Sequence, residues 1–124
     1  MALPGSGLIR FGRRPAAPDL PAEAEMLSAL GTPLLLVDPD GTAMAVNGAS
    51  ETLINLSRAA IVGRNIEAMI GHPLTSFPSD SPFAAYDTEI TLPGGRHQRA
   101  DLMVSPLPER AGWRVVTLHG RAPA

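Results

Sequence analysis

The alternation of apolar and polar residues predicts a hairpin followed by a capped helix in residues 32–47, TPLLLVDPDGTAMAVN. A four-residue apolar run at 34–37 leads into the turn sequence DPDG at 38–41, where proline presets φ and glycine can take a positive φ. A second run ends at Asn47, a good N-cap for a helix over 48–54. Because the first run has no polar face, we expect a strand near the middle of a sheet.

Short helical turns, rather than one long helix, are predicted after the hairpin. Ser57 can cap a helix over 58–62, and Asn65 can cap one over 66–70. A glycine follows each of these segments and can end the helix. The next segment, 72–83, contains three prolines, which leave room for only a turn or two of helix.

The remaining chain has the two-residue period of β-strands over 86–92, 96–107 and 113–118. The last of these is apolar on both sides, like 34–37, so we expect these two strands to be central neighbours. The resulting prediction is an α+β fold whose five-stranded antiparallel sheet has the order 2-1-5-4-3. The short helices would cover one face of this sheet. The residues expected to face the core are Tyr86, Thr88, Ile90 and Leu92 in the third strand and Ala100, Leu102 and Val104 in the fourth.

An amphipathic helix is predicted before the hairpin, over residues 19–30, and a disordered tail over 1–18. The helix could pack on its own domain or against its copy in a dimer. We favour the dimer, and we expect Leu27→Asp to weaken it. The apolar stripe consists of Leu20, Ala24, Leu27 and Leu30.

Composition narrows the classes of function. The 124 residues support one domain, with an ordinary apolar fraction of 44%. Net charge is −2 and all ten basic residues are scattered arginines, so we expect no nucleic-acid partner. The absence of cysteine excludes disulfides, thiolate metal sites and a flavin–thiol adduct. No run is long enough for a membrane span, and the Arg13-Arg14 pair lacks the hydrophobic region of an export signal, so we expect a cytoplasmic protein.

Histidines and aromatic residues are the candidates for ligand binding. His72 could be an axial haem ligand, but Pro73 follows it and the segment is broken, while His97 and His119 belong to a turn and a strand end. We therefore interpret all three as loop histidines, and we predict no metal and no cofactor. An aromatic-ligand pocket could alternatively be lined by Phe77, Phe83, Tyr86 and Trp113, which we interpret as core residues.

The chain resembles a PAS domain over about residues 26–119. The residues that carry the resemblance are LLLVDPDGTAMAVN with its Asn47 cap, IVGRNIEAMI around Gly63, and the three closing strands. More narrowly, PLLLVD, YDTEITL, ADLMVSPLPE and GWRVVTLHGR resemble the N-terminal sensor domain of the NtrB family of nitrogen-regulation histidine kinases. On this basis the PAS domain occupies 19–119, and 120–124 begin a linker.

The resemblance implies a cytoplasmic, dimeric kinase that phosphorylates or dephosphorylates its response regulator and receives a nitrogen signal through a PII protein. This chain carries no phospho-acceptor histidine motif, nucleotide lid, nucleophile elbow or paired carboxylates. We therefore expect a non-catalytic regulatory domain. It could be a stand-alone domain, but we favour a domain cut from a longer protein whose kinase domain is its partner. The residues expected at the homodimer interface are Leu20, Ala24, Leu27, Leu30, Leu35, Val37 and Val115.

Two alternatives remain open. The domain could be a sensor that binds haem, flavin or a metabolite inside the PAS fold. It could also belong to a different output protein, such as a cyclase or a transcription activator.

Overall fold

The structure, a computed structural model, describes residues 29–121. The predicted tail over 1–18, nearly all of the predicted helix over 19–30, and residues 122–124 lie outside this range. The described elements are β1 (Leu34–Val37), β2 (Ala43–Val46), α2 (Gly48–Ile54), α3 (Arg58–Ile61), α4 (Ile66–Ile70), the 3-10 helix η1 (Leu74–Ser76), β3 (Phe83–Leu92), β4 (Arg96–Pro106) and β5 (Arg114–Gly120).

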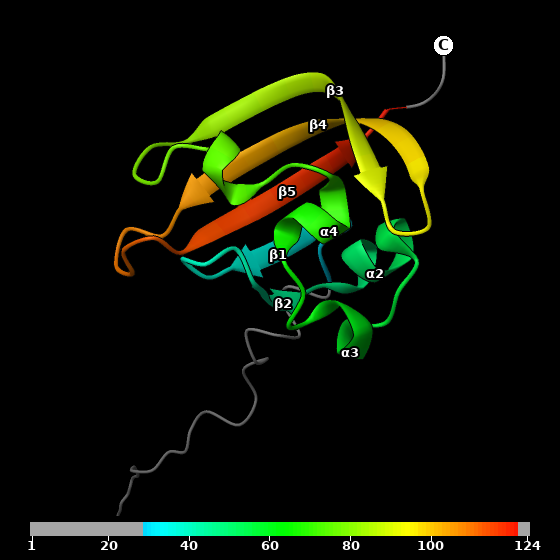
Figure 1. Ribbon diagram of the computed structural model, residues 1–124, viewed down its shortest axis with the longest axis horizontal. Helices are drawn as coiled ribbons and strands as arrows, with labels where there is room; N and C mark the ends of the chain where they lie inside the picture. The colour runs from blue at the N-terminus through cyan, green and yellow to red at the C-terminus, as the bar shows by residue number, and fades with distance from the viewer. Residues whose placement is uncertain (1–28, 122–124) are drawn as a thin grey trace, which may run out of the picture.

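The five strands form one antiparallel sheet in the order β2-β1-β5-β4-β3, which confirms the predicted topology (Figure 1). The two strands predicted to be central, β1 and β5, are hydrogen-bonded neighbours. The short helices gather on one face of the sheet, and the core lies between them and that inner face. Within residues 29–121, no helix has the length and apolar character needed to cross a membrane.

Strand β1 directs alternate side chains to opposite faces of the sheet. Leu35 and Val37 are fully buried in the core, and Leu36 is half-buried on the outer face. The register joins Leu35 to Val116 and Leu36 to Val115. This corrects the predicted interface, which grouped Leu35 and Val37 with Val115 on the outer face. Because every residue of β1 is apolar, the sequence does not show which alternate set points inward.

The hairpin between β1 and β2 is held by the side chain of Asp38. Its Oδ1 accepts hydrogen bonds from the backbone N–H groups of Asp40 and Thr42, both at 2.9 Å. Gly41 has φ of 90°, and its carbonyl accepts a hydrogen bond of 2.7 Å from the N–H of Ile66 at the start of α4. The turn therefore anchors the helical layer to the sheet as well as reversing the chain.

The two predicted asparagine caps are confirmed. The Oδ1 of Asn47 accepts from the N–H of Ser50 in α2, and that of Asn65 accepts from the N–H of Glu67 in α4, both at 3.0 Å. Helix α3 ends at Ile61, one residue earlier than predicted, and Ser57 precedes it without a side-chain capping bond.

A bulge in β3 changes which side chains of that strand face the core. Asp87 has a positive φ of 50°, and the pairing with β4 shifts register between Ala85 and Thr88. Ile90 and Leu92 are buried as predicted, but Tyr86 is 64% exposed. The prediction that Tyr86 shares their face is wrong, because a bulge inserts a residue and moves one part of a strand out of phase with the other.

Candidate functional site

Asn47 joins the start of β1 to helix α2. This fully buried side chain accepts hydrogen bonds at Oδ1 from the N–H groups of Leu34 and Ser50, and its Nδ2 donates to the carbonyl of Thr32 at 2.8 Å. Ser50, also fully buried, donates through Oγ to the carbonyl of Leu34 at 2.8 Å. The backbone preceding β1 is thus tied to the helical layer by buried polar groups, which are costly to leave unpaired.

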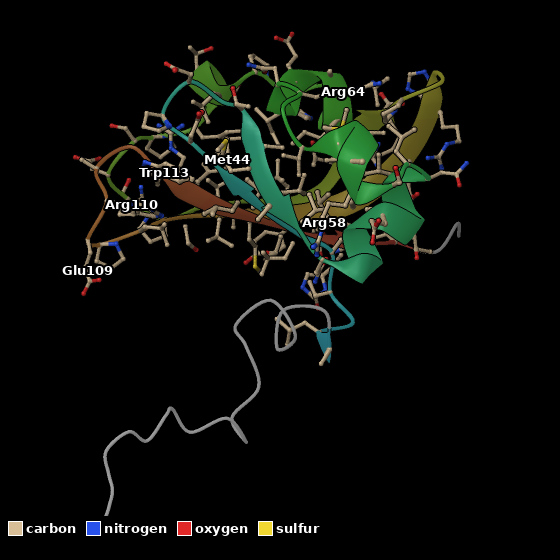
Figure 2. All side chains as sticks on the ribbon, turned by 90° about the horizontal axis from the view of Figure 1, so that it is seen from below. Met44, Arg58, Arg64, Glu109, Arg110 and Trp113 are labelled. Carbon is tan, nitrogen blue, oxygen red and sulfur yellow. The ribbon has the colours of Figure 1, made fainter. Side chains whose placement is uncertain are left out.

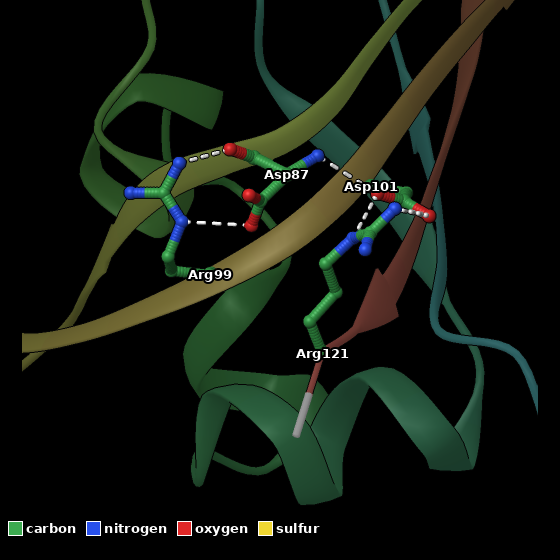
Figure 3. A network of polar contacts seen from close by, with 4 residues as sticks. All are labelled: Asp87, Arg99, Asp101 and Arg121. Atoms are coloured by element: carbon green, nitrogen blue, oxygen red, sulfur yellow. Dashed lines mark hydrogen bonds and ion pairs between the residues drawn. The ribbon is translucent and has the colours of Figure 1, made fainter. Parts of the chain in front are cut away.

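The end of β5 is held by a chain of charged residues on β3 and β4 (Figure 3). Arg121 donates from Nε to Oδ1 of Asp101 at 2.7 Å and from Nη2 to Oδ2 at 3.3 Å. The same Oδ1 accepts from the N–H of Asp87, whose carboxylate and carbonyl in turn accept from Arg99. The bond from Arg121, together with that from Asp87, lowers the pKa of the Asp101 carboxyl.

The start of β1 and the end of β5 are neighbours in the sheet. Leu34 pairs with Thr117, and the N–H of Leu118 donates to the carbonyl of Pro33 at 3.1 Å. The N–H of Arg121 continues the ladder by donating to the carbonyl of Arg99 on β4 at 2.9 Å. A displacement of the segment before β1 would therefore act directly on the strand from which the chain leaves the domain.

The outer face of the central strands is partly apolar. Leu34 and Leu36 on β1 lie opposite Thr117 and Val115 on β5, and Met103 on β4 lies opposite Thr117. All five side chains are half-buried. A sheet face with this apolar content can pack against another surface.

The structure separates the residues predicted for the dimer interface. Leu35 and Val37 on β1 were predicted for the outer face but belong to the core. Val115 on β5 lies on the outer face. Leu30 is 49% exposed and precedes β1. Sequence reasoning missed Leu34 and Leu36, which face the same way as Val115. The other three predicted residues, Leu20, Ala24 and Leu27, lie outside the described range.

The four aromatic residues proposed as pocket lining do not converge. Phe77 and Phe83 contact each other, with ring centroids 5.4 Å apart, whereas Tyr86 is exposed on the edge strand. Trp113 lies near the start of β5, where the guanidinium of Arg110 stacks 4.1 Å from its ring centroid. Figure 2 shows this pair at one end of the sheet.

The three histidines are not part of a metal site formed by the described residues. The Nε2 of His72 is 3.0 Å from the carbonyl of Glu89, and the Nδ1 of His97 is 3.5 Å from the Glu89 carboxylate. His119 is exposed at the end of β5. Across residues 29–121, no three His, Cys, Asp or Glu side chains come together in a way that could hold a metal ion.

Arg114 is a functional candidate that sequence reasoning missed. It begins β5 and shares the inner face of the sheet with Val116 and Leu118, and only 6% of it is exposed. Its Nε and Nη1 atoms are buried without a hydrogen-bond partner among the described residues. The alternation of β5 puts Arg114 on the same face as Val116, but the sequence does not show that this face is the inner one, because the strand is apolar on both sides.

Comparisons with solved structures identify the fold. The chain is similar to the PAS domain of nitrogen regulation protein NR(II) from Vibrio parahaemolyticus, with 20% identity, a TM-score of 0.69, and coverage of 82% of this chain and 100% of that one. A domain of a sensory box sensor histidine kinase/response regulator from Geobacter sulfurreducens has 14% identity and a TM-score of 0.65, covering 77% and 88%. The PAS domain, in complex with ethanol, of a LuxR-family transcriptional regulator from Burkholderia thailandensis has 16% identity and a TM-score of 0.64, covering 81% and 97%. No family profile and no curated protein matches the sequence.

Proposed function

We propose that this chain, which has the PAS fold, is the regulatory and dimerisation domain of a two-component sensor histidine kinase. The single observation that carries the proposal is the contact between the start of β1 and the end of β5, through the bond from Leu118 to Pro33. Because the start of β1 and the end of β5 are hydrogen-bonded in one sheet, a displacement of one can displace the other.

In the proposed mechanism, repacking of two protomers shifts the segment before β1. Asn47 holds this segment against α2, and the β1–β5 ladder passes the shift to Arg121. A kinase region connected after β5 would receive the change. A coupling of about 1–3 kcal/mol between two arrangements is enough to bias kinase output against phosphatase output.

The proposed dimer surface is the outer face of β1 and β5, including Leu34, Leu36 and Val115. The predicted helical stripe of Leu20, Ala24, Leu27 and Leu30 would pack beside it, on either the same or the partner chain. An aspartate at position 27 would then place a charge in an apolar contact and weaken the dimer.

The similarity to the NR(II) domain supports a more specific assignment to nitrogen regulation of the NtrB type. In that role the full-length protein would be a cytoplasmic kinase. Its response regulator and a PII protein would be partners of the full-length protein. The domain itself would carry no catalytic step and would act through protein contacts.

Native mass spectrometry of the chain tests the proposal, because it reports stoichiometry and retained mass together. We expect a dimer without added mass, and the same measurement on Leu27→Asp should show a larger monomer fraction. A chain that stays monomeric at every concentration contradicts the dimerisation proposal.

A second candidate function is that of a small-molecule sensor, in this or another output protein such as a cyclase or transcription regulator. The buried Arg114 favours it, because its Nε and Nη1 atoms lack a hydrogen-bond partner within residues 29–121, and a guanidinium binds anions readily. The solved Burkholderia PAS domain is in complex with ethanol, so a PAS fold of this type accepts a small organic molecule. A retained mass in the same spectrum would support this candidate.

A further inference from the structure

Arg114 is the only buried charged residue among residues 29–121, and the Nε and Nη1 atoms of its guanidinium are buried. The other six arginines of this range lie on the surface, and three of them hold the described bonds to Asp87, Asp101 and the end of α2. None of the three described ion pairs involves Arg114, and neither Nε nor Nη1 has an acceptor within this range.

A guanidinium has five N–H donors and no acceptor, so a buried one needs oxygen acceptors to satisfy its hydrogen bonds. Burying a charge without a partner is among the most costly arrangements in a protein. An anion that binds the guanidinium would therefore stabilise the folded chain considerably. The position of Arg114 at the first residue of β5 places this group at the end of the core rather than in its middle.

The surroundings of Arg114 indicate the kind of anion. Its neighbours in the ladder are Val37 on β1 and Pro106 on β4, and Val116 follows it on the same face. The turn at 38–41 closes over the β4–β5 loop nearby, since a Cβ on Gly112 would lie 3.0 Å from the Cβ of Pro39. One buried positive charge among apolar groups matches a monoanion better than a dianion.

We propose that Arg114 is a binding site for the carboxylate of a small organic acid with a short apolar body. The planar guanidinium presents paired N–H donors that match the two oxygens of a carboxylate. The apolar neighbours would contact the hydrocarbon part of the acid. This site does not depend on the proposed dimer or on the histidine-kinase assignment.

Propionate is the probe for the test, with sodium chloride at equal ionic strength and inorganic phosphate as comparisons. We expect propionate at ten times its Kd to raise the Tm of the full chain by at least about 4 °C. In a 15N-labelled sample, the Nε–H resonance of Arg114 should shift as propionate is added. The Arg114→Met variant should lose the rise in Tm, and the matched Arg110→Met variant, which removes a surface arginine four residues away, should keep it.

Several outcomes would overturn the proposal. An equal rise in Tm with chloride would show screening rather than binding, and an equal rise in Arg114→Met would place the site elsewhere. A response to phosphate without a response to propionate would exclude a carboxylate. A carboxylate from the chain outside residues 29–121 could already pair with Arg114, and propionate would then move neither Tm nor the resonance. Should Arg114→Met fail to fold, the resonance of the unmodified chain still decides the question.

Discussion

Arg121 and Asp101 form a two-pronged ion pair in which Nε and Nη2 of the arginine contact both carboxylate oxygens, at 2.7 and 3.3 Å. The pair joins the residue after β5 to the middle of β4. Since Asp101 also accepts the N–H of Asp87, one carboxylate connects the end of β5 to the bulge of β3. The last part of the sheet before the chain leaves the domain is therefore held by charge as well as by the backbone ladder.

The Asp101 pair should make stability depend on pH in the acid range. The bond from Arg121 lowers the pKa of Asp101 below its ordinary 3.8, so the folded chain binds this proton less readily than the unfolded chain. The contribution of the ion pair to the free energy of unfolding is complete above pH 3.8, and it is lost as pH falls through the lowered pKa of Asp101. Urea unfolding of the chain and of Asp101→Asn should differ at pH 7 and converge in strong acid. Because both side chains are accessible to solvent, added salt should narrow the difference. A difference that persists unchanged in strong acid would contradict this reading.

Asn47→Ala should destabilise the fold by about 2–4 kcal/mol. The variant removes the helix cap on the N–H of Ser50, worth about 1 kcal/mol, and leaves the part-buried N–H of Leu34 without its side-chain acceptor, at about 1–3 kcal/mol. Asn65→Ala is the matched control, because Asn65 caps α4 from an exposed position and should cost only about 1 kcal/mol. Equal losses in urea unfolding would show that Asn47 acts as a cap alone.

The opposite orientations of Leu35 and Leu36 predict different costs for the same truncation. Leu35→Ala should lower the free energy of unfolding by about 2–5 kcal/mol, because it opens a cavity in the closed core. Leu36→Ala should cost about 1 kcal/mol in the monomer, since its side chain is half-exposed there. Denaturant unfolding at low protein concentration, where the chain is monomeric, measures the loss in the free energy of unfolding for each variant. A larger loss for Leu36→Ala would contradict the β1 register.

The dimer proposal predicts that Leu36→Asp raises the dimer dissociation constant by at least about tenfold, equivalent to about 1.4 kcal/mol. The reason is that a carboxylate would be buried in an apolar contact without a partner. Sedimentation equilibrium gives the constant, and circular dichroism confirms that the variant is folded. Tyr86→Asp is the matched control, because Tyr86 is an exposed residue on edge strand β3, away from β1. An unchanged constant for Leu36→Asp, or an equal change for Tyr86→Asp, would remove the outer face of β1 from the interface.

Local sequence determined most of the elements of this domain. The turn at 38–41, the caps at Asn47 and Asn65, and the alternation of Ala100, Leu102 and Val104 each depend on a few neighbouring residues, and the structure confirms all of them. The sheet order also agrees with the sequence prediction, which made the apolar runs at 34–37 and 113–118 central neighbours, as β1 and β5 are.

Three features were decided only by the tertiary structure. The orientation of Leu35 and Leu36 depends on the register with β5, because an all-apolar strand has no phase of its own. The exposure of Tyr86 follows from a bulge that the alternating sequence of β3 does not reveal. The burial of Arg114 follows from its position beside Val37 at the first residue of β5, since a charged side chain is buried only when distant segments pack around it. Periodicity and capping are short-range properties that a sequence displays directly, whereas register, bulges and burial depend on which distant segments meet.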